Sequence, residues 1–85
     1  MNYMIYKYDD ELDTIPMNGG CKVILDVSEL KFASTRFLHK LIDVKENVVL
    51  ANLHGQPKQA FVICGLDGII KTFNSTKEAE IFLKN

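Results

Sequence analysis

A hydroxyl pair followed by a cation is the first feature of this sequence that could do chemistry. Ser34, Thr35 and Arg36 stand in the stretch FASTR, and an apolar-periodic run, FLHKLI, comes directly after them. Ser and Thr at such a position are favoured helix N-caps. A phosphate on Thr35 would meet the positive end of that helix and the Arg36 guanidinium. The pair could therefore be a helix cap, a phosphoacceptor at Thr35, a catalytic nucleophile or the edge of a docking surface.

The nucleophile interpretation lacks the groups that it needs. A catalytic hydroxyl requires a nearby base and donors that stabilise an oxyanion, and the GxSxG motif that builds such a site does not occur in the sequence. Nothing in the spacing marks His39 or His54 as the base. We therefore expect no catalytic residues and no enzyme, and we expect helix capping to be the main role of Ser34 and Thr35.

Metal and cofactor sites are not predicted either. The acidic cluster at residues 9–13 lacks the spacing, the glycine and the final glutamate of an EF-hand loop. Cys21 and Cys64 are far apart and have no metal-ligand spacing, so we expect two reduced and mostly buried thiols. The glycines form no phosphate-binding loop. We predict no metal and no cofactor.

Two helical stretches carry candidate binding surfaces. In the first, the polar positions are Arg36, His39, Lys40 and Asp43. They lie opposite the apolar positions Phe37, Leu38, Leu41 and Ile42, which we expect to be buried and to anchor the helix to the sheet. This polar side is either a solvated helix face or a basic rim for an acidic partner.

The second stretch, PKQAFVIC, has three consecutive apolar residues that span more than one buried face of a helix. Phe61 and Val62 are therefore candidates for a homodimer or partner patch. The alternative is that the C-terminal helix covers them.

Composition excludes several classes of protein. The chain of 85 residues is 47% hydrophobic and 25% charged, which is typical of one globular domain over residues 1–85. Its net charge of −1 argues against a strongly basic nucleic-acid binder. Because the sequence has neither a signal peptide pattern nor an apolar run of about 20 residues, we expect no membrane span and a cytoplasmic location.

Hydrophobic patterning predicts strands that alternate with helices. Short apolar and β-branched runs predict strands at Tyr3–Tyr8, Lys22–Val27, Glu46–Leu53 and Gly68–Phe73. Amphipathic spacing and capping signals predict helices at residues 34–43, 57–64 and 75–85, with Gly65 just past the second. We therefore expect an α/β fold, with a small, mostly parallel sheet of about four strands flanked by about three helices. The N-terminal strand should be antiparallel or at an edge.

Two blocks of the sequence resemble one known family. VILDVSELKF, followed by a hydroxyl pair that opens a helix, and GLDGIIKTFNSTKEAEIFL occur in the order found in STAS domains. This family includes anti-sigma factor antagonists and the cytoplasmic tails of sulphate transporters. The resemblance implies a shortened STAS-like domain that acts by binding a protein. It would be either a non-catalytic regulator resembling an anti-sigma factor antagonist or a small accessory subunit of a transporter or another multiprotein complex.

The resemblance also implies candidate residues, with two departures from the family pattern. The family's phosphoacceptor cluster is D-S-S-G, and the ungapped alignment places Ser34, Thr35, Arg36 and Phe37 on it. Arg36 thus occupies the position of the regulated Ser, which leaves Thr35 as the possible phosphoacceptor. The family's usual first helix is missing between Asp13 and Cys21. STAS domains contact their partners with the helix that starts at the hydroxyl pair and with the loop before it. The implied partner-binding residues are therefore Ser34, Thr35, Arg36, His39 and Lys40.

Overall fold

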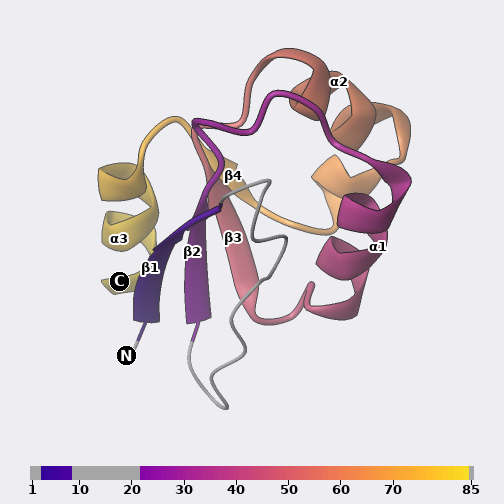
Figure 1. Ribbon diagram of the computed structural model, residues 1–85. Coiled ribbons are helices and arrows are strands. Elements are labelled where there is room, and N and C mark those ends of the chain that lie inside the picture. The colour runs from indigo at the N-terminus through magenta and orange to yellow at the C-terminus, as the bar shows by residue number, and fades with distance from the viewer. Residues whose placement is uncertain (1–2, 9–21, 85) are drawn as a thin grey trace.

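Four strands form one sheet with helices on both of its faces (Figure 1). The computed structural model describes residues 3–8 and 22–84. The strands are β1 (Tyr3–Lys7), β2 (Lys22–Asp26), β3 (Val48–Ala51) and β4 (Thr72–Phe73). The helices are α1 (Thr35–Asp43), α2 (Gly55–Ile63) and α3 (Thr76–Lys84), with a 3-10 helix, η1, at Leu66–Gly68. The predicted α/β fold is confirmed.

The sheet follows chain order, β1-β2-β3-β4, and each pair of neighbouring strands is parallel. Ile5 lies beside Ile24, and Ile24 lies beside Val49. β1 lies at an edge of the sheet, as one of the two predicted arrangements requires, and it is parallel rather than antiparallel. Because all strands point the same way, their carboxyl ends meet at one end of the sheet.

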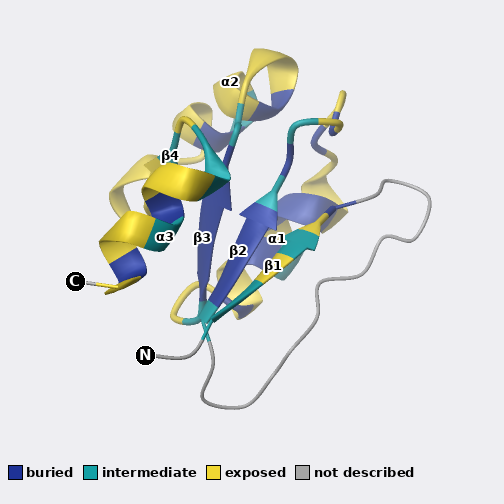
Figure 2. Ribbon diagram, turned by 90° about the vertical axis from the view of Figure 1, so that its left-hand side faces the viewer, coloured by how far each residue is buried: buried dark blue, intermediate teal, exposed yellow. Residues whose placement is uncertain are grey.

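α1 and α2 pack on one face of the sheet, and α3 packs on the other (Figure 1). On the first face, Phe37, Leu41 and Phe61 join a large core with side chains of the strands. On the second face, α3 contributes Ala79 and Leu83 to a smaller core with Ile24, Val49 and Ala51. Figure 2 shows β2 and β3 buried between these layers. The continuous apolar runs in these two strands follow from this burial on both faces.

β4 is shorter than predicted. The apolar run Gly68–Phe73 favours a strand, but only Thr72–Phe73 pairs with β3. Gly65 follows the end of α2 with a φ of 77°, a left-handed conformation that glycine adopts readily. The chain then turns through η1, where the N–H of Ile70 donates to the carbonyl oxygen of Leu66 at 2.9 Å and both side chains are buried. The first part of the predicted strand therefore forms this turn, although its β-branched residues favour a strand.

Two predictions of burial are wrong. Ile42 is 42% exposed, because at about 100° per residue it lies at the border of the buried arc of α1. Cys64 is exposed, since it is the C-cap of α2 at the surface of the domain. Other predictions lie outside the described residues: the acidic cluster at residues 9–13, Cys21 and the missing family helix between Asp13 and Cys21.

Candidate partner-binding site

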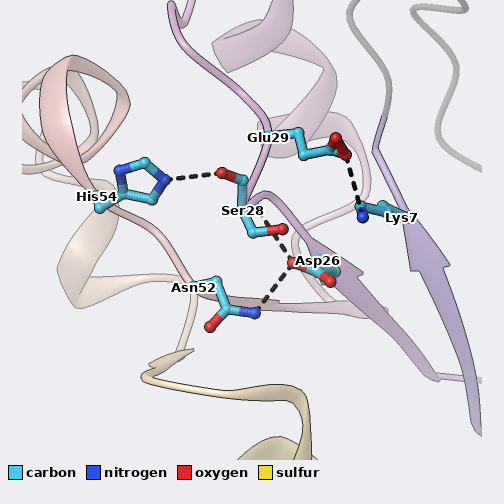
Figure 3. A network of polar contacts seen from close by, with 6 residues as sticks. All are labelled: Lys7, Asp26, Ser28, Glu29, Asn52 and His54. Carbon is cyan, nitrogen blue, oxygen red and sulfur yellow. Dashed lines mark hydrogen bonds and ion pairs between the residues drawn. The ribbon is translucent and has the colours of Figure 1, made fainter.

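Polar side chains gather where β2 and β3 end (Figure 3). Asp26 is the last residue of β2 and lies beside Ala51, the last residue of β3. Ser28 comes shortly after β2, and Asn52 comes directly after β3. The parallel pairing therefore brings these side chains to one end of the sheet. From here, the loop at residues 27–34 leads into α1.

Asp26 joins the two strand ends. Its Oδ1 accepts one hydrogen bond from the backbone N–H of Ser28 and one from Asn52 Nδ2, each at 3.0 Å. Partial burial acts to raise the pKa of Asp26, but the hydrogen bonds from Asn52 and Ser28 outweigh it and hold the pKa below its ordinary value. The ionised carboxylate is therefore the form that this arrangement stabilises.

Asn52 is a site residue that sequence reasoning misses. Its φ is 64°, in the left-handed region that costs most residues about 1–2 kcal/mol. Asparagine tolerates this region better because its short side chain forms local hydrogen bonds. Its backbone N–H also donates to the carbonyl oxygen of Phe73 at 3.0 Å. An asparagine directly after a buried strand is the signal that could have indicated this turn.

The connection between β3 and α2 holds the loop before α1 at two points. His54 Nε2 donates to the carbonyl oxygen of Ser28 at 2.8 Å. Gln56 Oε1 accepts a hydrogen bond from the backbone N–H of Ala33 at 2.8 Å. Ala33 itself is buried. The backbone is thus fixed near both ends of the loop.

An ion pair lies beside this loop at the surface. Lys7 Nζ of β1 and Glu29 Oε2 are 3.0 Å apart, and both side chains are more than half exposed. The hydrogen bond and the charge of Glu29 raise the pKa of Lys7. Solvent screens such a pair, so it contributes little to stability. Its local effect is to balance the Glu29 carboxylate with a cation.

The two hydroxyl residues at the start of α1 have different structural positions. Ser34 is the N-cap, and its Oγ accepts a hydrogen bond from the backbone N–H of Phe37 at 3.1 Å. Thr35 is the first residue of the helix and is exposed. The predicted cap is therefore confirmed for Ser34 alone, and Thr35 remains on the surface.

The other predicted partner-binding residues lie along the outer side of α1. Arg36 and His39 are exposed, and Lys40 is half-buried. The opposite side of the helix is buried in the core through Phe37, Leu38 and Leu41. The five predicted residues thus occupy one surface that begins at the helix cap.

The predicted patch on α2 is divided by burial. Phe61 is 1% exposed and belongs to the core, so it does not contribute to a surface. Val62 is 49% exposed and Ile63 is 84% exposed, and they line a shallow depression with Lys58 and Gln59. The alternative, in which the C-terminal helix covers this patch, is wrong because α3 packs on the other face of the sheet.

Two of the polar side chains of this site bind backbone atoms. Ser34 Oγ is bound to the N–H of Phe37, whereas His54 Nε2 is bound to the carbonyl oxygen of Ser28. In the part of the chain that the structure describes, no three His, Cys, Asp or Glu side chains are grouped so that they could hold a metal ion. These hydrogen bonds order the surface at the start of α1.

The parallel sheet and the surface at the start of α1 define a small α/β domain whose ordered edge is formed by strand ends and a helix cap. The family model of the STAS domain matches residues 6–79, which include the whole of this site. The chain therefore belongs to the STAS domain family. Comparisons with curated proteins and with solved structures give no match.

Membership of this family describes the domain in general terms. STAS domains are found in anti-sigma factor antagonists and in transporters, they are generally non-enzymatic, and they mediate protein–protein interactions. Among residues 3–8 and 22–84, no helix is long and apolar enough to cross a membrane.

Proposed function

We propose that this STAS domain is a non-catalytic regulatory module that binds a protein partner through the start of α1, as an anti-sigma factor antagonist would. The observation that carries the proposal is the two-sided character of α1. One side is buried in the core, while Thr35, Arg36 and His39 are exposed on the other. A helix anchored in this way presents its side chains with little further ordering, which reduces the entropic cost of binding.

The matching surface of the partner is expected to be acidic. The segment from Leu30 to Asp43 contains three cations, Lys31, Arg36 and Lys40, and one carboxylate, Asp43, so its net charge is +2. The carboxylates just before it are already engaged, since Glu29 pairs with Lys7 and Asp26 accepts two hydrogen bonds. Charge complementarity of this kind accelerates association and weakens as salt is added.

Arg36 makes the proposed binding constitutive. It occupies the position at which other members of the family carry a regulated Ser, and its guanidinium stays charged at all physiological pH values. A phosphate, in contrast, can be added and removed. Thr35 is the remaining possible phosphoacceptor, because it is exposed at the helix N-terminus, where a phosphate is stabilised.

A second candidate function is an accessory subunit of a transporter or another multiprotein complex. The exposed side chains of Val62 and Ile63 favour it, because they give the domain an apolar surface on a different helix. Such a surface suits a stable contact with a larger assembly or with a second copy of the chain.

A charge reversal on α1 tests the proposal. The tagged chain is used to capture a protein from the cells that produce it, and the captured protein is then identified, purified and titrated against variants. Arg36→Glu with Lys40→Glu should raise the Kd at least ~10-fold at low salt, since like charges would then face each other. The matched control is Lys77→Glu with Lys84→Glu on α3, which makes the same change of charge at exposed positions. Equal affinity for the two double variants would reject α1 as the binding surface.

A further inference from the structure

A large aromatic side chain is exposed next to the proposed binding surface. Phe32 is 63% exposed, although Leu30 and Ala33 on either side of it are buried. It lies in the loop before α1, and at most about 14 Å of extended chain separates its Cα from that of Arg36. Phe32 and the basic side of α1 are therefore close enough to contact one partner.

The backbone that carries Phe32 is held by hydrogen bonds before and after it. The N–H of Leu30 donates to the carbonyl oxygen of Val27 at 3.1 Å. The N–H of Ala33 donates to Gln56 Oε1 at 2.8 Å. The ring is thus presented from an ordered loop, and binding needs to immobilise only the side chain.

We infer that Phe32 is the apolar anchor of the partner interface and inserts into an apolar socket on an acidic protein. The inference rests on the proposed function of α1 and adds the chemistry of the partner, which is a hydrophobic pocket rimmed by carboxylates. Lys31 directly precedes Phe32 in the sequence and Arg36 follows it by four residues, and both cations are exposed. Protein interfaces commonly have this arrangement, with a buried aromatic residue surrounded by a polar rim.

The charge of the whole chain favours a protein over a nucleic acid as the occupant. The phosphate backbone of a nucleic acid would be repelled by a domain with a net charge of −1. A protein partner needs only local charge complementarity to the segment around Phe32 and Arg36. An apolar pocket with carboxylates at its rim would bind both the Phe32 ring and the cations near it in the sequence.

The test begins with a photocrosslinker in the cells that produce this protein. p-Benzoyl-phenylalanine replaces Phe32 in one variant and Ile63 in another, because Ile63 is the most exposed residue of the rival patch on α2. The protein crosslinked through position 32 is identified and purified. It is then titrated against the unmodified chain, Phe32→Ala, Phe32→Trp, Ile63→Ala and the double variant Arg36→Glu with Lys40→Glu. Circular dichroism confirms that each variant is folded.

Phe32→Ala should raise the Kd at least ~10-fold, as expected for a central aromatic anchor, while Phe32→Trp should retain most of the affinity. Ile63→Ala should leave the Kd within about twofold, because most residues outside the energetic centre contribute little. Loss of affinity in the charge-reversed variant with unchanged affinity in Phe32→Ala would overturn the role of Phe32 and leave the proposed function intact. If no protein is crosslinked through position 32, or if only Ile63→Ala loses affinity, this role is also overturned. Unchanged affinity in the charge-reversed variant would reject the proposed function as well.

Discussion

α1 and α2 are nine-residue helices that pack on the same face of the sheet, but they present different chemistry to solvent. α1 begins at a Ser34 cap that is bonded to its own first turn, and its polar side carries Arg36, His39, Lys40 and Asp43. The N-cap of α2 is His54, whose ring is hydrogen-bonded to the loop before α1, and the exposed side of α2 carries Val62 and Ile63. The start of α2 therefore supports the surface of α1, since the hydrogen bonds of His54 and Gln56 both hold the loop before α1.

The largest expected effect concerns the two neighbouring apolar residues of α2. Phe61→Ala should destabilise the domain by about 3–5 kcal/mol, because it empties a fully buried position. Val62→Ala removes a half-exposed side chain and should change the free energy of unfolding by no more than about 0.5 kcal/mol. Urea unfolding followed by circular dichroism measures both. Similar losses for the two variants would contradict the division of this helix into a core side and a surface side.

Asn52 tests how the strand ends support the start of α1. Asn52→Ala should cost about 2 kcal/mol, since it removes the hydrogen bond to the Asp26 carboxylate and leaves a non-glycine residue at a φ of 64°. Asn52→Gly loses the same hydrogen bond but adopts this φ without strain, so it should cost about 1 kcal/mol less. Thermal and urea unfolding give the difference. If glycine is as destabilising as alanine, the left-handed backbone is not a source of the cost.

The hydroxyl pair of α1 provides a smaller and sharper contrast. Ser34→Ala should cost about 1 kcal/mol, because Ser34 Oγ is the N-cap acceptor for Phe37. Thr35→Ala should have an effect of less than about 0.5 kcal/mol, since Thr35 is exposed in the first turn. Both values come from urea unfolding at neutral pH. A larger loss for Thr35→Ala than for Ser34→Ala would reverse the assignment of the cap.

The smallest effect is the pH dependence due to Asp26. Its pKa in the folded protein lies below its ordinary value, so ionisation of Asp26 contributes stability above about pH 5, and this contribution is lost as the pH falls through the folded pKa. The stability difference between the unmodified chain and Asp26→Asn should therefore be constant near neutral pH and should change below about pH 4. Urea unfolding from pH 3 to pH 7 measures it. A difference that is independent of pH would show that Asp26 does not titrate in this way.

Much of the fold could be predicted from local sequence. The apolar runs around Ile24 and Val49 predict buried strands, and Gly65 correctly predicts the end of α2. The extent of β4 could not be predicted, because the turn through η1 buries Ile70 but leaves Ile69 54% exposed, and the apolar run does not indicate this difference.

The site was predictable only in part. The surface of α1 and the cap at Ser34 follow from helical spacing and from the resemblance to STAS domains. The hydrogen bond between Asn52 and Asp26 joins residues that are distant in sequence, so it depends on which strands are neighbours in the sheet. The exposure of Phe32 likewise depends on how Leu30 and Ala33 are buried on each side of it. Neither the hydrogen bond nor the exposure of Phe32 follows from local sequence, although an asparagine directly after a buried strand indicates the turn at Asn52.

The most direct test of the central claim is the footprint of the purified partner on this domain, measured by backbone amide hydrogen exchange with and without the partner. Binding through the start of α1 should slow exchange from residue 28 to residue 40 and leave α3 unchanged. The Arg36→Glu, Lys40→Glu variant should lose this protection at the same partner concentration. Protection confined to α3, or to Val62 and Ile63, would contradict the claim that α1 is the binding surface.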